Sequence, residues 1–186
     1  DPWEGLVMPL TGEYQAEKAA VALRALELLR EKGCNIPEEA VRRGLKTVRW
    51  PGRFEVLSRD PVFLLDGAHN AHGMRAAVKS LEALFPGRRW TFLLGILSDK
   101  DAGEMLDLLA PLAERAFVLR PDSPRAMDPA ALRALLAERG VEARPCASVE
   151  EGLRAALAAA GRDGAVCALG SLYLCGEVRS AWFKRR

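Results

Sequence analysis

From about residue 54 onward, hydrophobic and polar positions follow two alternating patterns. Short apolar runs suited to buried strands recur, and most are followed by stretches with apolar residues three or four positions apart, as in amphipathic helices. Strands are expected at 54–57, 62–65, 90–94, 115–119, 142–145 and 165–169. Helix-breaking and N-capping residues separate the elements, such as Pro86-Gly87, Asp128-Pro129 and Ser148, which opens a Ser-x-x-Glu capping box. The pattern predicts an α/β fold, with a mostly parallel sheet, right-handed crossovers and helices on both faces.

The first 50 residues show only helical spacing. One helix is expected from about residue 11 to Gly33, and a second, shorter helix is expected from Pro37 to about residue 45. Two helices of this size bury too little surface to form a domain by themselves. The Pro-Gly turn within 50–53 then ends the helical pattern. We therefore expect a boundary near residue 51, with the two helices packed against another domain and an alternating α/β domain after the turn.

Polar residues with chemical potential follow the ends of the expected strands. Asp66, His69 and Asn70 come directly after the apolar run 62–65. The carboxyl ends of parallel strands meet at one edge of a sheet, where helix N-termini offer free N–H groups to anions. The turns at 66–70, 95–101, 120–123 and 170–171 are therefore expected along one edge. The residues alone thus predict an α/β domain that binds a small anion or nucleotide.

Each of these residues also has a purely structural interpretation. Asp66 fits an N-cap or Asx turn as well as an acceptor of ribose hydroxyls. Lys100 lies between two aspartates and fits a surface ion pair, while Ser171 could simply cap a helix and Arg53 could be solvated in its turn. The sequence contains no Walker-type phosphate loop, no Gly-x-Gly-x-x-Gly fingerprint and no serine-elbow motif.

Composition narrows the possible functions. The chain has 186 residues, 49% of them hydrophobic and 28% charged, and its net charge of +2 argues against a dedicated nucleic-acid surface. The four cysteines form no Cys-x-x-Cys pair and the two histidines lack zinc-site spacing, so no metal ligands are expected in this chain. No apolar run approaches the ~20 residues of a membrane span, and free thiols favour a cytoplasmic location.

Five motifs occur in an order that identifies a family resemblance. They are Gly12-Glu-Tyr-Gln-Ala-Glu-Lys-Ala-Ala-Val-Ala-Leu23, Trp50-Pro-Gly-Arg-Phe-Glu55, Leu65-Asp-Gly-Ala-His-Asn70, Asp99-Lys-Asp101 and Gly170-Ser-Leu-Tyr-Leu174. Together they resemble the C-terminal part of folylpolyglutamate synthase/dihydrofolate synthase, in the Mur ligase superfamily. The resemblance covers nearly the whole chain and is closer to the folate branch than to the cell-wall ligases.

The resemblance implies an ATP-dependent acid–amino-acid ligase. Such an enzyme converts the γ-carboxyl group of a folate, or the carboxyl group of dihydropteroate, to an acyl phosphate, which the amine of L-glutamate attacks. ATP and Mg²⁺ are the implied cofactors, and the phosphate loop and metal ligands come from an N-terminal ATPase domain. The resemblance implies that residues 1–50 are the end of that central ATPase domain and the hinge, and that residues 51–186 are the C-terminal Rossmann-like glutamate-ligase domain. The implied partners are ATP, glutamate, folate and that ATPase domain. No nucleic acid or membrane partner is expected, and the protein is expected to be a monomer. The chain alone is therefore expected to be inactive.

The resemblance also implies roles for individual residues. The implied residues are catalytic His69; nucleotide-binding Arg53, Asp66 and Lys18; and substrate-binding Lys100, Ser171, Asn70 and Tyr173. Two positions depart from the family pattern Gly-x-His-Gln-x-x-Asn, because Tyr14 replaces the His and Lys18 replaces the Asn. Two other hypotheses stay open: a free-standing nucleotide or amino-acid binding module, and the C-terminal domain of a cell-wall Mur ligase.

Overall fold

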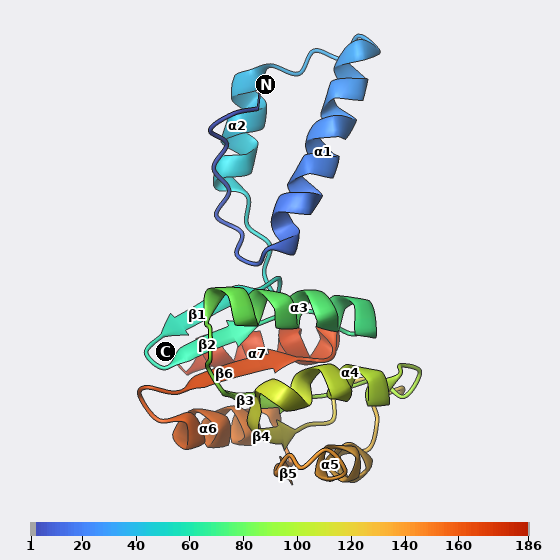
Figure 1. Ribbon diagram of the computed structural model, residues 1–186, viewed down its shortest axis with the longest axis vertical. Helices are drawn as coiled ribbons and strands as arrows, with labels where there is room; N and C mark the ends of the chain where they lie inside the picture. The colour runs from blue at the N-terminus through green and yellow to red at the C-terminus, as the bar shows by residue number, and fades with distance from the viewer. Residues whose placement is uncertain (1–2, 186) are drawn as a thin grey trace.

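The computed structural model describes residues 3–185, so Asp1, Pro2 and Arg186, at the outer limits of the two expected segments, lie outside the described residues. The chain forms an α/β body from which a helical hairpin projects (Figure 1). The hairpin consists of α1 (Tyr14–Glu31) and α2 (Glu38–Thr47). It leads into the body through the turn at 50–54.

The body is built on a six-stranded sheet with the order β1-β2-β6-β3-β4-β5. The strands are β1 (Glu55–Arg59), β2 (Val62–Leu65), β3 (Trp90–Leu94), β4 (Ala113–Val118), β5 (Ala143–Pro145) and β6 (Ala165–Leu169). Strand β1 pairs antiparallel with β2, and every other neighbouring pair is parallel. The predicted mostly parallel sheet is therefore confirmed, with one antiparallel edge strand. Residues of β3 and β6 are buried throughout, as expected for central strands covered on both faces.

Helices cover both faces of this sheet. They are α3 (Ala71–Leu84), α4 (Ala102–Leu109), the 3₁₀ turn η1 (Ala110–Leu112), α5 (Pro129–Ala137), α6 (Val149–Ala160) and α7 (Leu172–Lys184). One hydrophobic cluster joins α3, α4 and α5 to one face, through residues such as Met74, Leu106 and Leu132. A second cluster joins α6 and α7 to the other face, through Leu153 and Val178. Figure 1 shows the two layers on opposite sides of the strands.

The predicted capping residues begin the helices they were expected to begin. Asp128 accepts hydrogen bonds from the backbone N–H groups of Ala130 and Ala131 at the start of α5. Ser148 accepts one from Glu151 at the start of α6. Strands β2, β3 and β6 have the bounds expected from the sequence, and the other expected boundaries differ from the observed ones by up to three residues.

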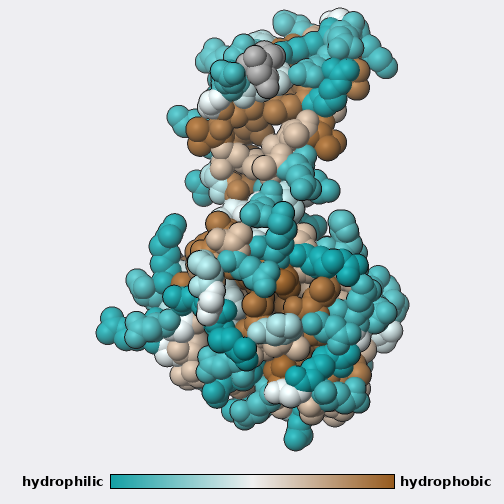
Figure 2. All heavy atoms as spheres, viewed as in Figure 1, coloured by the Kyte–Doolittle hydropathy of each residue, from teal (hydrophilic) through white to brown (hydrophobic). Residues whose placement is uncertain are grey.

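The helical hairpin has little core of its own. Within residues 3–50 only Gln15 and Val41 are buried. Apolar side chains of α1, including Val21 and Leu28, remain exposed, and Figure 2 shows apolar residues gathered along the hairpin. The domain boundary near residue 51 stays a prediction, and the small buried core of the hairpin makes it testable. Among residues 3–185, no helix has both the length and the apolar character needed to cross a membrane.

Candidate functional site

The strand-end loops meet at one edge of the sheet, as predicted. The N–H of Asp66, after β2, donates to the carbonyl of Ala168 at 3.0 Å, and the N–H of Gly170, after β6, donates to the carbonyl of Ala68 at 2.8 Å. A Cβ on Gly170 would lie 2.9 Å from the carbonyl oxygen of Gly95, after β3. Three loops that are distant in sequence therefore form a continuous surface.

Asp66 lies at the centre of this edge and is almost completely buried, with 3% of its surface exposed. Its Oδ1 accepts a hydrogen bond from the N–H of Ala68 at 2.8 Å. Its Oδ2 accepts two, from the N–H of Phe54 at 2.8 Å and from the hydroxyl of Tyr14 at 2.7 Å. Burial raises the pKa of Asp66 above its ordinary value, and these hydrogen bonds oppose the shift. The carboxylate thus joins its own loop, the hinge and the helical hairpin.

The hinge turn that contacts Asp66 has an unusual backbone. Phe54 adopts a positive φ of 46°, a region that non-glycine residues rarely occupy. This conformation accompanies the hydrogen bond from its N–H to Asp66, while its ring is buried in the core. The N–H of Gly67 donates to the carbonyl of Gly52 at 2.8 Å and closes the contact between turn and loop. Local strain at such a place is typical of functional sites.

Arg53 directs its guanidinium to the same region. A Cβ built on Gly67 would lie 2.8 Å from Nη1 of Arg53, so the guanidinium lies against the bare backbone of the Asp66 loop. Within residues 3–185 this half-buried cation makes no hydrogen bond or ion pair. A guanidinium without a hydrogen-bond partner, beside a glycine that carries no side chain, is suited to bidentate binding of a phosphate.

His69 and Asn70 follow in the same loop. The carbonyl of Gly67 accepts a hydrogen bond of 2.8 Å from Nδ1 of His69. Because a carbonyl only accepts, the proton is on Nδ1, and in the neutral ring Nε2 carries the lone pair. Asn70 caps α3, since its Oδ1 accepts from the N–H of Gly73 at 2.8 Å. Its amide nitrogen has no hydrogen-bond partner among residues 3–185.

Lys100 follows β3 and forms an ion pair, as the structural interpretation of the sequence expected. Its Nζ lies 2.9 Å from Oδ2 of Asp99, and 29% of the lysine side chain is exposed. Nη1 of Arg125 lies 3.1 Å from the same carboxylate oxygen. The pKa of Asp99 is lowered mainly by the hydrogen bond from Lys100. Because Arg125 also neutralises Asp99, Lys100 could leave this pair without leaving an uncompensated carboxylate.

Ser171 and Tyr173 open helix α7 beside β6. Ser171 is buried and caps α7, with its Oγ accepting from the N–H of Tyr173 at 3.2 Å. The hydroxyl hydrogen of Ser171 remains able to donate. The Tyr173 side chain is half exposed. Together with the positive end of the α7 dipole, this arrangement favours an anionic group near Ser171.

Lys18 is not brought into this group. It lies one helical turn after Tyr14 on α1 and is exposed, with no side-chain partner among residues 3–185. Two contributors to the site were absent from the expected set. Tyr14 bonds Asp66, and the thiol of Cys175 donates to the backbone carbonyl of Asp66 at 2.9 Å. The departure of Tyr14 from the family pattern was the only sequence signal for either residue.

The described residues do not form a metal site. Within residues 3–185, no three His, Cys, Asp or Glu side chains come together as candidate ligands. The donors at the sheet edge are a guanidinium, an ammonium group, hydroxyls and N–H groups, which suit anions. The chemistry available here is therefore recognition of phosphate, hydroxyl and carboxylate groups.

Fold and site together define a Rossmann-like α/β domain whose sheet edge carries groups suited to binding anions. Residues 52–172 match the family described as Mur ligase, glutamate ligase domain. A probable bifunctional folylpolyglutamate synthase/dihydropteroate synthase of Halobacterium salinarum is 36% identical over 98% of this chain and 22% of its own length. The chain belongs to the Mur ligase family of glutamate ligase domains, which confirms the resemblance seen in the motifs.

Solved structures agree. Folylpolyglutamate synthase of Mycobacterium tuberculosis, complexed with ADP, superposes with a TM-score of 0.86 at 30% identity, over 95% of this chain and 42% of that chain. The bifunctional folylpolyglutamate synthase/dihydrofolate synthase of Yersinia pestis, complexed with AMPPNP and a Mn ion, gives 0.78 at 31% identity, over 97% and 41%. This chain therefore spans less than half the length of the relatives it matches.

Proposed function

We propose that this chain is the C-terminal, glutamate-binding part of an ATP-dependent ligase that joins L-glutamate to folate or dihydropteroate. The observation that carries the proposal is the unpaired guanidinium of Arg53 beside Asp66, at the sheet edge of a chain that belongs to this family. An ATPase domain supplies the phosphate loop and the Mg²⁺ ligands. The relatives complexed with ADP and with AMPPNP and a Mn ion support the use of ATP and a divalent metal ion. We further propose a cytoplasmic monomer.

Arg53 and Asp66 serve ATP in this proposal. Arg53 contacts the phosphates and stabilises the charge that develops during phosphoryl transfer. Asp66 accepts a hydrogen bond from the ribose. Lys18, at the position where the family has an asparagine, is assigned to the nucleotide by the resemblance alone, because it lies outside the group of residues at the sheet edge.

Lys100, Ser171, Asn70 and Tyr173 serve the incoming glutamate. The ammonium of Lys100 exchanges Asp99 for a glutamate carboxylate, and Arg125 keeps Asp99 compensated. The hydroxyl of Ser171 donates to the same group at the positive end of α7. Asn70 offers its amide, and the exposed ring of Tyr173 borders the site.

His69 lies between the two substrates and carries the catalytic role. With its proton on Nδ1, its Nε2 can take a proton from the glutamate ammonium. The free amine then attacks the acyl phosphate, and phosphate leaves with the electrons of the broken C–O bond. The attacking nitrogen gives up a second proton, which the leaving phosphate takes, and a neutral amide remains. The other residues bind and orient the substrates, which supplies the rest of the rate enhancement.

Steady-state kinetics on the full-length enzyme, varying one substrate at a time, tests these roles. Loss of a hydrogen bond to a charged group costs roughly 1.5–3 kcal/mol, or about tenfold to over a hundredfold. Lys100→Ala should raise the apparent KM for glutamate by that factor and leave the KM for ATP nearly unchanged, and Asp66→Ala should do the converse.

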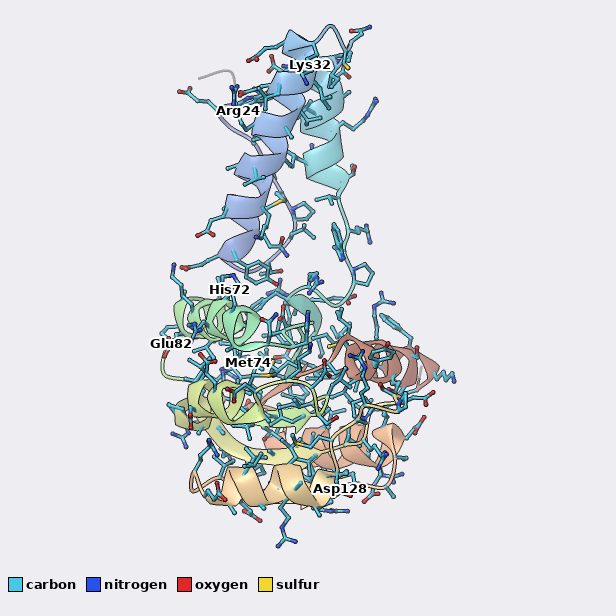
Figure 3. The ribbon with its side chains drawn as sticks, turned by 90° about the vertical axis from the view of Figure 1, so that its right-hand side faces the viewer. Arg24, Lys32, His72, Met74, Glu82 and Asp128 are labelled. Carbon is cyan, nitrogen blue, oxygen red and sulfur yellow. The ribbon has the colours of Figure 1, made fainter. Side chains whose placement is uncertain are left out.

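A matched control is Arg24→Ala, which removes an exposed ion pair of 2.9 Å on the hairpin, far from the strand ends (Figure 3). It should change neither KM appreciably. Equal effects of Lys100→Ala on both substrates, or no effect at all, would show that Lys100 is only a surface ion pair.

A further inference from the structure

Tyr14 is the side chain that ties the helical hairpin to the nucleotide-facing carboxylate. It is the first residue of α1, and its hydroxyl donates to Oδ2 of Asp66, 52 positions later, at 2.7 Å. The ring packs against the hydrophobic cluster that contains Phe54. Burial, and then the charge of Asp66, raise the pKa of the Tyr14 phenol, so the hydroxyl keeps its proton and remains a donor.

The Asp66 carboxylate can accept only a limited number of hydrogen bonds. A carboxylate has about four lone-pair sites, two on each oxygen. Both sites of Oδ2 are used, by Tyr14 and by the N–H of Phe54, and one site of Oδ1 is used by the N–H of Ala68. One site is left on a residue that is 3% exposed. The two neighbouring hydroxyls of a ribose need two sites.

Of the three groups that donate hydrogen bonds to Asp66, only the Tyr14 hydroxyl is able to move away. The N–H of Ala68 belongs to the Asp66 loop itself, and the N–H of Phe54 is held by the hinge turn whose Gly52 carbonyl bonds Gly67. Tyr14 is a side chain on a hairpin that projects from the body (Figure 1). The start of α1 is also attached through the N–H of Glu13, which donates to Oγ of Ser80 at 3.1 Å, and through the exposed Glu13–Lys79 ion pair. The buried side chain of Gln15, in the same turn, hydrogen-bonds the Tyr14 side chain and belongs to the hairpin itself.

We propose that Tyr14 and the ribose of a nucleotide compete for Oδ2 of Asp66, so that a nucleotide engages Asp66 with both ribose hydroxyls only when Tyr14 leaves it. Displacement of Tyr14 frees the start of α1 and so couples nucleotide binding to a shift of the hairpin relative to the sheet. Tyr14 is therefore a residue that sets nucleotide affinity without contacting the nucleotide. This inference rests on the proposed function, in which Asp66 receives the ribose.

The test measures ATP and 2′,3′-dideoxy-ATP affinities by calorimetry on the full-length protein. Tyr14→Phe keeps the ring and removes only the hydroxyl. It should raise ATP affinity about tenfold, the size of one hydrogen bond to a charged acceptor, and leave the affinity for the dideoxy analogue unchanged. In an Asp66→Asn background, Tyr14→Phe should have a much smaller effect, because the two residues act as one unit.

The outcomes separate this inference from the proposed function. A wild-type preference for ATP over the dideoxy analogue, combined with an unchanged or weaker ATP affinity in Tyr14→Phe, overturns the competition and leaves the role of Asp66 standing. Equal wild-type affinity for the two nucleotides overturns both. A gain in affinity for both nucleotides in Tyr14→Phe would show a general loosening of the hairpin and also overturns the competition for Oδ2.

Discussion

Gly67 is the position where a single methyl group should disturb the site without unfolding the protein. A Cβ there would lie 2.5 Å from Cδ2 of Leu172, 2.8 Å from Nη1 of Arg53 and 3.2 Å from the carbonyl oxygen of Gly52. The first two atoms are the ends of flexible side chains, and Leu172 is half exposed, so both can turn away. The carbonyl of Gly52 is less free, because it accepts the N–H of Gly67 itself.

These contacts set the expected changes in unfolding free energy and in nucleotide affinity for Gly67→Ala. Overpacking typically costs about 1–3 kcal/mol, and movable neighbours place Gly67→Ala at the low end of that range. Gly67 does not have a positive φ, so replacing it also restricts the unfolded chain, which offsets about 0.4–1 kcal/mol. We expect unfolding free energy to change by no more than ~2 kcal/mol. Displacement of Arg53 should weaken nucleotide binding by about tenfold or more.

Urea denaturation and calorimetry with ATP provide the two readouts. Gly44→Ala is the matched control, since Gly44 lies inside α2, has a negative φ and would place its Cβ in open space. It should stabilise the protein by up to ~1 kcal/mol and leave nucleotide binding unchanged. An ATP affinity in Gly67→Ala equal to that of the wild type would refute the reasoning, because nucleotide binding would then not depend on the observed position of the Arg53 guanidinium.

Two further predictions concern the hairpin and the thiols. Limited proteolysis should leave a resistant core that begins near Arg53, because residues 3–50 contribute little buried surface; equal resistance of residues 10–46 would disprove a boundary there. Of the four cysteines only Cys34 is exposed, and burial raises the pKa of Cys175 to about 12. A thiol reagent at pH 8 should therefore modify one cysteine in the native protein and four after denaturation, whereas rapid native modification of Cys175 would contradict its burial.

Much of the architecture could be read from local patterns. Apolar runs such as 62–65 and 165–169, and caps such as Asp128 and Ser148, depend on short-range chemistry, so their elements form where the sequence indicated. The topological rule that parallel strands share a carboxyl edge then placed the loops of Asp66 and Gly170 together. The motifs at those loops identified the family because their order is specific.

The tertiary structure decided which partners each candidate side chain has. Nothing local to Lys100 indicates that Arg125 shares Asp99 with it, and nothing local to Asp66 indicates that Tyr14, Phe54 and Ala68 occupy three of its lone-pair sites. These contacts join residues up to 52 positions apart, so they depend on how the hinge folds back on the sheet. Residue types and spacing determined what chemistry the edge could carry, whereas long-range packing determined which donors already occupy its central carboxylate.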